Sequence, residues 1–333
     1  MRNKALAAAL GIAISGLFLW WALKGLSFTE VWHHATRANV GLILLSVTMA
    51  TATFVIRIFR WRLLLRTDDG GPVGRMPMWH AIAIGFMANN ILPFRAGEFL
   101  RAVAINRIAP VKFSSALSSL VLERIFDALA IIGLLFLGLV TAGIPATTKI
   151  GNVVVADVAA KVAILCLLLL LGCGATLGFP DFAKRVIRTL VPSTRIADRL
   201  SEFLDGIRGG FQALSSPKRV AAAALWSIGM WLVNAASFWV GYRAFGIEVG
   251  YGGAILQQSI LVFGIAAPST PGYVGVFEGI VKAVLALFAV PGDLAVAFAL
   301  TYHVATFLPI TLLGFVSLFQ TGLSLKAGRM SAT

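Results

Sequence analysis

Residues 267–278 read Ala267-Pro268-Ser269-Thr270-Pro271-Gly272-Tyr273-Val274-Gly275-Val276-Phe277-Glu278 and interrupt one of the longest apolar regions of the chain. No helix runs through such a segment, because each proline removes a backbone N–H and clashes with the preceding turn, and the glycines add an entropic cost. Inside a membrane, the freed backbone groups are tolerated only where protein buries them or a wet cavity surrounds them. We therefore expect a helix break formed by Pro268, Ser269, Pro271, Gly272 and Gly275.

A second break of the same kind lies nearer the N-terminus. Residues 89–98 read Asn-Asn-Ile-Leu-Pro-Phe-Arg-Ala-Gly-Glu, so an apolar run again meets a proline and a glycine, and a glutamate again follows. Broken hydrophobic segments at corresponding places in two halves of a chain are the best sequence indication of a transporter binding site. Two ordinary loops between spans are the alternative. We expect this break at Pro93 and Gly97.

The composition indicates an all-α polytopic membrane protein. The chain is 59% hydrophobic and only 13% charged, whereas about a quarter of the residues of a soluble domain are charged. The net charge is +14, but the basic residues lie mostly in short loops between apolar runs, which is what the positive-inside rule produces. We therefore exclude nucleic acid as a partner.

Six apolar stretches have about the length that spans a bilayer. They are residues 5–23, 40–56, 114–140, 153–179, 220–245 and 294–319. Five arginines follow the second stretch and mark that side as cytoplasmic; topology explains most of them, while contact of any one with a lipid phosphate stays open. The short basic N-terminus and the basic C-terminal tail are expected in the cytoplasm, which requires an even number of full spans. The expected location is a bacterial cytoplasmic (inner) membrane, crossed several times.

Two further apolar stretches, at residues 79–92 and 254–266, are too short to span comfortably. Both flanks of the first are basic, so we expect a re-entrant hairpin at about residues 79–105 that enters from the cytoplasm. The second, at about residues 254–290, then enters from the opposite side. The predicted fold is about six full transmembrane helices plus two oppositely oriented re-entrant helical hairpins, an inverted repeat whose hairpin tips meet near the midplane.

The chain is expected to form a single integral membrane domain over residues 1–333. Its first repeat half covers residues 1–140 and its second covers residues 220–322. Residues 180–219 form a basic cytoplasmic segment, in which residues 195–214 have the spacing of an amphipathic helix. The two cysteines share one apolar run and the four histidines are scattered, so no metal site and no cofactor are predicted.

The span at residues 114–140 carries ionisable side chains. Glu123 and Asp127 are four residues apart and share one helix face, and Arg124 can neutralise a neighbour. Such groups are costly in a membrane and usually face the bundle interior or a watery cavity. A structural ion pair to a hairpin arginine, such as Arg95 or Arg101, and a functional role are both open, and the two are compatible.

Three motifs together carry a family resemblance. They are Asn90-Ile91-Leu92-Pro93 with Arg95, Gly97-Glu98 and Arg101; Leu122-Glu123-Arg124 with Asp127; and Pro268-Ser269-Thr270-Pro271-Gly272 with Gly275 and Glu278. In this order the chain resembles, over essentially its whole length, the lysylphosphatidylglycerol synthase transmembrane family, also called flippase-like. That family includes the flippase half of the bacterial multiple peptide resistance factor and hopanoid-associated membrane proteins. The resemblance implies movement of lipids between leaflets.

Two departures from the family pattern are visible. Gly272-Tyr273 stands where the family often has two glycines after the proline. Only fourteen residues follow Phe319, so the soluble synthetase domain that attaches lysine to phosphatidylglycerol is not expected, and neither is synthesis of the lysyl lipid.

The first functional hypothesis is a lipid translocase rather than an enzyme. Arg95 and Arg101 are the predicted ligands of a head-group phosphate, because a guanidinium pairs with phosphate in bidentate fashion. Acidic side chains would balance those charges or carry protons. The full set of predicted substrate-binding residues is Asn90, Arg95, Glu98, Arg101, Glu123, Arg124, Asp127 and Glu278.

Two alternatives remain. One is a membrane-embedded transferase acting on a lipid-linked substrate, with paired acids such as Glu123 and Asp127 as general acid and base. The other is a non-catalytic membrane subunit of a lipid or envelope biosynthesis system. The expected partners are membrane lipids and proteins of lipid biosynthesis, and the apolar outer faces are compatible with a monomer or a homodimer.

Overall fold

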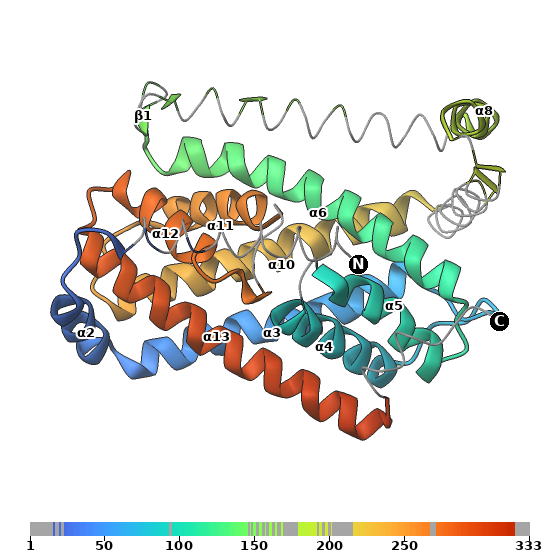
Figure 1. The fold of residues 1–333 in the computed structure, drawn as a ribbon, viewed down its shortest axis with the longest axis horizontal. Helices are drawn as coiled ribbons and strands as arrows, with labels where there is room; N and C mark the ends of the chain where they lie inside the picture. The colour runs from blue at the N-terminus through green and yellow to red at the C-terminus, as the bar shows by residue number, and fades with distance from the viewer. Residues whose placement is uncertain are drawn as a thin grey trace.

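The computed structural model describes residues 23–92, 95–145, 179–191, 216–266 and 271–323, with isolated positions at 16 and 20 and between 147 and 201 (Figure 1). These residues form ten α-helices, one 3-10 turn and one pair of short strands. The elements are α2 (Phe28–Arg37), α3 (Val40–Leu64), α4 (Arg75–Ile91), α5 (Ala96–Ile108), α6 (Phe113–Thr141), β1 (Lys149–Ile150), β2 (Val153–Val154), α8 (Pro180–Leu190), α10 (Pro217–Ala244), α11 (Tyr251–Ala266), η2 (Pro271–Tyr273), α12 (Val276–Ala286) and α13 (Gly292–Thr321). The two strands pair antiparallel.

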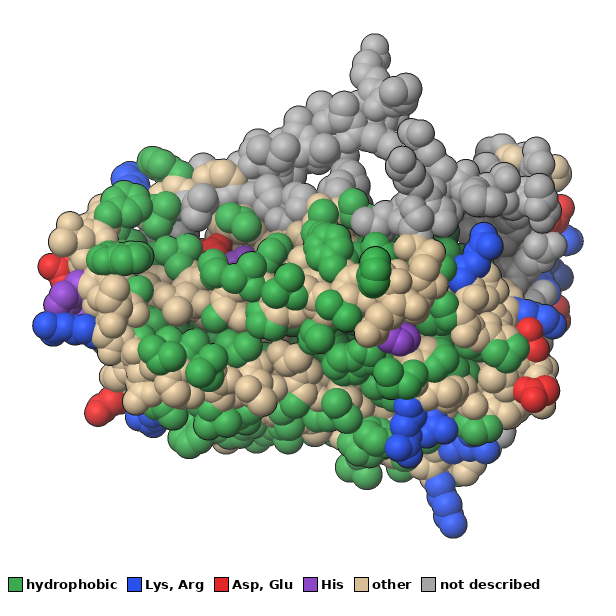
Figure 2. Space-filling view, turned by 90° about the horizontal axis from the view of Figure 1, so that it is seen from below, with side chains coloured by type: hydrophobic (Ala, Val, Ile, Leu, Met, Phe, Trp, Pro, Cys, Tyr) green, Lys and Arg blue, Asp and Glu red, His purple; other side chains and the backbone are tan. Residues whose placement is uncertain are grey.

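The long helices have the character of membrane spans. Among the described residues, α3, α10 and α13 are long and apolar enough to cross a membrane, and α6 has 29 residues. Large apolar side chains are exposed on their outer faces, including Leu44, Leu225 and Leu312, and Figure 2 shows such side chains spread over one face of the molecule. A soluble monomer rarely exposes so much apolar surface. The protein is a multi-pass membrane protein.

The sequence predicted three of these long helices closely. The expected spans at residues 114–140, 220–245 and 294–319 match α6, α10 and α13 closely. The expected spans at residues 5–23 and 153–179 and the expected amphipathic helix at residues 195–214 lie almost entirely outside the described residues. The count of six crossings therefore stays a prediction.

The expected second span, residues 40–56, lies within a longer helix. Helix α3 continues to Leu64, because arginine is a good helix former and the carboxylates of α6 pair with the arginines of this last part. Arg57, Arg60, Trp61 and Leu64 are all buried, and their spacing puts them on one helix face. Arginines that the sequence placed beyond a span therefore lie inside the protein.

Helices α4 and α5 pack against each other, and together they cover residues 79–105, where a hairpin was expected. At their closest approach, a Cβ added to Gly97 would lie 1.9 Å from the Gly85 carbonyl oxygen, so no other residue fits there. The Asn89 side chain closes the turn by accepting a hydrogen bond from the Gly97 N–H at 2.9 Å. Residues 79–105 are thus two packed helices and not one continuous span.

Helices α11 and α12 form the second pair, around the break at residues 267–275. Gly272 has φ +68° and Gly275 has φ +87°, a region of backbone conformation that glycine adopts without steric cost. A Cβ on Gly264 of α11 would lie 2.1 Å from the Ile280 side chain of α12, so these two helices also pack closely. The break was expected in this segment because of its prolines and glycines.

The ends of the two pairs meet inside the bundle. In Figure 1, α4 and α5 lie in the right half, α11 and α12 in the left half, and the loop with η2 reaches toward α4. A Cβ on Gly272 of η2 would stand 3.4 Å from the Asn90 carbonyl oxygen of α4. The hairpin ends are therefore in contact.

Helix α13 joins both pairs and contains a proline, Pro309. On one side of that proline, Thr311 accepts a 2.8 Å hydrogen bond from the Asn90 side chain. On the other side, His303 Nδ1 lies 2.6 Å from the Glu278 carboxylate of α12. Each hairpin is thus tied to the same helix.

Candidate functional site

A cavity of about 380 Å³ lies between the two breaks. Helices α3, α4, α5, α6, α10 and α11 and the η2 turn all contribute to its wall. An adjoining cavity of about 210 Å³ shares seven residues with it. The shared residues are Arg57, Phe86, Asn90, Trp231, Val262, Ile265 and Tyr273. The two spaces therefore adjoin each other, and charged side chains line the larger one.

Glu123 of α6 is the centre of a buried ionic network on one side of this region. It is fully buried. Arg101 of α5 donates two hydrogen bonds to its carboxylate, of 2.8 and 3.0 Å. Arg60 of α3 lies 3.0 Å from the same carboxylate and also pairs with Asp127 one turn further along α6. The ion pair between Glu123 and Arg101, one of the alternatives left open by the sequence, is present.

Aromatic side chains fix this network in place. The Arg101 guanidinium lies 3.8 Å from the centre of the Trp61 ring, which gives a cation–π contact. Trp231 of α10 donates from its indole nitrogen to Asp127 at 3.0 Å. The buried charges are therefore held by four helices at once, α3, α5, α6 and α10.

The outer part of the network is more accessible. Arg124 reaches Glu98 at 3.5 Å and Glu123 at 2.8 Å, and Arg95 lies 3.8 Å from Glu98. The side chains of Arg95 and Arg124 are 37% and 39% exposed. Since both also line the larger cavity, they form its charged rim.

The network has an excess of positive charge. Within the described residues it holds five guanidinium groups and three carboxylates, which leaves two formal positive charges. The five are Arg57, Arg60, Arg95, Arg101 and Arg124, and the three are Glu98, Glu123 and Asp127. An excess charge inside a membrane protein is costly unless an anion neutralises it. The cavity is therefore suited to an anion.

The backbone is strained at both breaks, next to the cavity. Arg95 has φ +51° and Tyr273 has φ +61°, a left-handed conformation that costs a residue with a side chain about 1–2 kcal/mol. Both side chains line the larger cavity. Strain of this kind persists where the surrounding structure fixes it and is common at functional sites.

Several of the predicted site residues meet in one place. Arg95, Glu98, Arg101, Glu123, Arg124 and Asp127 belong to the network described above, and Asn90 and Gly97 line the cavity. Pro93, Pro268 and Ser269 lie outside the described residues. Pro271 and Gly272 lie in the η2 turn.

Glu278 has a different position from the other predicted charges. It is buried and accepts the Gly275 N–H at 2.6 Å, so it caps α12. Its other oxygen contacts His303. Neither cavity wall includes Glu278, whereas His303 lines the smaller cavity. Through these two contacts, Glu278 stabilises the start of α12 at the second break.

Sequence reasoning missed three residues of this region: Arg57, Arg60 and Trp231. A helical reading of residues 57–64 would have found the two arginines, because positions 57, 60, 61 and 64 fall on one face. Trp231 lies 104 residues from Asp127, so no local pattern connects them.

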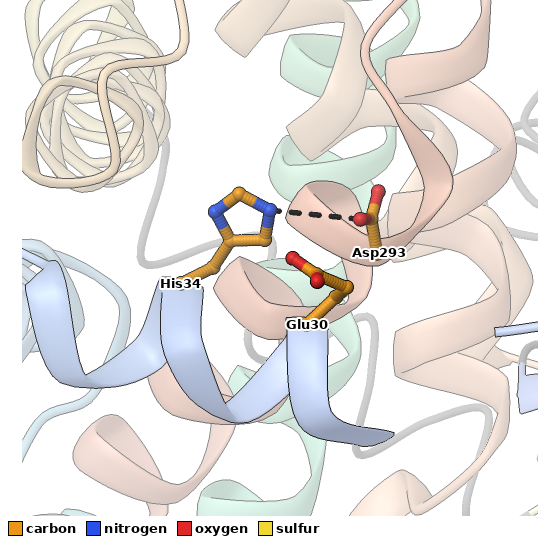
Figure 3. Close-up of side chains that lie close together, drawn as sticks. All are labelled: Glu30, His34 and Asp293. Atoms are coloured by element: carbon orange, nitrogen blue, oxygen red, sulfur yellow. Dashed lines mark ion pairs between the residues drawn. The ribbon is translucent and has the colours of Figure 1, made fainter. Parts of the chain in front are cut away.

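A separate cluster lies near the α2–α13 contact. Glu30, His34 and Asp293 place one ligand atom each within 4.8 Å of one another, and Figure 3 shows His34 and Glu30 on α2 facing Asp293. His34 Nε2 is 3.6 Å from the Asp293 carboxylate. Carboxylates and imidazole are the ligand types of several divalent metals, although the half-exposed ion pair accounts for the arrangement by itself.

One family model and several known proteins are similar to this chain. The model of the lysylphosphatidylglycerol synthase TM region matches residues 8–314. A UPF0104 membrane protein of Methanothermobacter thermautotrophicus is 24% identical, with 82% of this chain and 81% of that protein aligned. A UPF0104 membrane protein of Pyrococcus horikoshii is 23% identical over 94% and 95% of the two chains.

A third relative is named as an enzyme. Glycosyltransferase AglD of Haloferax volcanii is 24% identical over 72% of this chain, but the alignment covers only 42% of AglD. The family match covers most of this chain, and it agrees with the motifs at the two breaks and on α6. The chain belongs to the lysylphosphatidylglycerol synthase transmembrane region family.

Proposed function

We propose that the protein is a lipid translocase that moves a polar or phosphate-bearing lipid between the leaflets of a cell membrane. One observation carries this proposal: a cavity with two excess positive charges lies inside an apolar helical bundle, where two helix breaks meet. A head group crosses hydrocarbon slowly because it loses its hydration. Fixed guanidinium groups supply substitute partners.

In this proposal, the α4–α5 and α11–α12 pairs are re-entrant hairpins that enter from opposite sides of the membrane. They would form an inverted repeat, within about six full spans and with both termini in the cytoplasm. Support comes from the contact between η2 and the end of α4. Basic side chains also gather mainly at one end of the molecule, on the right in Figure 2. The positive-inside rule would place that end in the cytoplasm of a bacterial cell.

The charged rim suggests the order in which the residues would contact the head group. Arg95, Glu98 and Arg124 are partly exposed and would receive the head group first. The deeper arginines, which are buried, would attract it further into the cavity. The lipid would leave unchanged, so the protein would act as a transporter and not as an enzyme, with lipids as its main partners.

A second candidate function follows from the similarity to AglD, which is named as a glycosyltransferase. In that case the cavity would hold a lipid-linked substrate while a sugar or another group is transferred. Glu98, at the rim, would then be the accessible carboxylate. Chemical conversion of the lipid, with or without a biosynthetic partner protein, would distinguish this candidate from a translocase.

The experiment is a leaflet-exchange assay. The purified full chain is placed in liposomes that carry fluorescent phospholipid, polyprenyl phosphate or hopanoid, and a membrane-impermeant quencher reports which label is accessible. Arg95→Ala is compared with Arg107→Ala, which removes an exposed arginine from the other end of the same helix. The proposal expects movement of at least one lipid class, loss of that movement in Arg95→Ala and retention in Arg107→Ala. Absence of movement for all classes, with and without a pH gradient, would refute it.

A further inference from the structure

Arg57 is the buried cation that the ionic network leaves incompletely paired. It is 6% exposed and belongs to α3, and it lines both cavities. Its Nε and Nη1 atoms have no hydrogen-bond partner among the described residues. Its position at the junction of the two spaces means that a ligand in either cavity can reach it.

The neighbours of Arg57 do not complete its pairing. Its nearest carboxylate oxygen is Oε1 of Glu123, at 3.8 Å. That oxygen already pairs with Arg60 at 3.0 Å and with Arg101 and Arg124 at 2.8 Å. The carboxylate oxygen nearest to Arg57 is therefore already paired with three other guanidinium groups.

Aromatic rings occupy the remaining space around Arg57. Its guanidinium carbon lies 4.8 Å from the centre of the Phe86 ring and 5.7 Å from that of Trp231. Ring faces stabilise a cation in part, but they accept no hydrogen bond in the guanidinium plane. The planar edge of Arg57 thus stays available, and a planar fork of N–H donors matches two oxygens of a phosphate.

We propose that Arg57 binds the phosphate of the transported lipid, and that the site selects a dianionic phosphomonoester head group. This inference rests on the proposed lipid-translocase function and names its substrate class. A phosphomonoester carries about −1.5 to −2 charges at neutral pH, which matches the two excess positive charges of the network. A phosphodiester neutralises one of them, and a zwitterionic head group neutralises neither.

The low dielectric of the site makes this match selective. Charges interact more strongly inside a protein than in water, so a head group that leaves one of the two positive charges unneutralised binds less tightly than one that neutralises both. The cavity volume of about 380 Å³ lies in the usual range of small-ligand sites, roughly 300–1,000 Å³. It can hold a phosphate with its first ester carbons, while the lipid chain stays among the apolar side chains around it.

The test measures binding and needs no transport. The purified full chain in detergent micelles is titrated with short-chain phosphatidic acid, phosphatidylglycerol or phosphatidylcholine, and tryptophan fluorescence reports binding. We expect phosphatidic acid to bind at least tenfold more tightly than the other two at pH 8. The preference should decrease at pH 5, because the second pKa of a phosphomonoester is about 6 and the head group then carries one charge.

Variants locate the site. Arg57→Gln should weaken phosphatidic acid binding at least tenfold, and Arg57→Lys should not restore it fully, because lysine lacks the planar fork. Arg107→Gln is the matched control and should bind as wild type does. If Arg57→Gln does not yield folded protein, Arg95→Gln provides the test: its side chain is partly exposed, and removing its charge should reduce the preference for phosphatidic acid.

Three results would overturn the inference. Equal affinity for phosphatidic acid and phosphatidylglycerol would remove the selectivity for a phosphomonoester. Unchanged binding in Arg57→Gln, or in Arg95→Gln where that variant is used, would remove the site. Inorganic phosphate binding as tightly as phosphatidic acid would show that the ligand is free phosphate. Arg57-dependent binding without leaflet exchange would refute the translocase alone, so failure of one proposal is distinguishable from failure of the other.

Discussion

The contact between Gly85 and Gly97 allows a sharp test of the first helix pair. A Cβ on Gly97 would lie 1.9 Å from the Gly85 carbonyl oxygen, whereas ordinary contact begins at 3.4 Å. In Gly97→Ala, α4 and α5 must therefore separate by about 1.5 Å. The movement also breaks the hydrogen bond from Gly97 to Asn89.

The expected cost follows from these two changes. Overpacking of a well-packed contact costs about 1–3 kcal/mol, and loss of one hydrogen bond costs about 1 kcal/mol. We expect Gly97→Ala to lower the free energy of unfolding by about 2–4 kcal/mol. The assay is reversible unfolding in mixed detergent micelles, followed by the fluorescence of the eight tryptophans.

A matched control is present in α6. A Cβ added to Gly133 meets nothing within 4 Å, so Gly133→Ala should be neutral, or should stabilise the helix by up to about 1 kcal/mol through helix propensity. Equal stability of Gly97→Ala and Gly133→Ala would refute the close approach of α4 and α5, and with it the hairpin geometry that positions Arg95.

Three other substitutions test separate parts of the structure in the same unfolding assay. Glu123→Gln removes the carboxylate that several buried arginines share, and should cost about 3–5 kcal/mol, the range for breaking a buried ion pair; a cost below 1 kcal/mol would mean that the network is not formed. Glu278→Ala removes the cap on Gly275 and the partner of His303, and should cost about 1–2 kcal/mol by loss of the cap alone, whereas wild-type stability would show that the break holds without it. Tyr273→Gly relieves a left-handed conformation and should raise stability by about 1 kcal/mol, while it opens the wall between the two cavities; a large loss of stability would show that packing of the ring outweighs the strain.

Local chemistry made the helix breaks predictable. Proline and glycine act on the backbone within a few residues, and helices α4 and α11 end at Ile91 and Ala266, next to the segments in which the sequence predicted breaks. The ion pair between Arg101 and Glu123 could also be anticipated from the sequence, because few groups in a membrane protein can neutralise a carboxylate in the middle of a span.

The rest of the site depends on long-range packing. Arg57 and Arg60 were assigned to a cytoplasmic flank because charges normally end a span, and their burial inside the protein could not be seen in the sequence. The pairing of Glu278 with His303 joins residues on separate helices, and no spacing rule connects them. The excess charge of the cavity becomes visible only after these partners are known.

The attachment of both hairpins to α13 has a mechanical consequence. Asn90 is held by Thr311 and Glu278 by His303, and Pro309 lies between those two anchor points. A proline inside a helix removes one backbone hydrogen bond and is the commonest cause of a kink. Because Thr311 and His303 lie on opposite sides of Pro309, a change in the bend of α13 at Pro309 would move the end of α4 relative to α12 and the η2 turn.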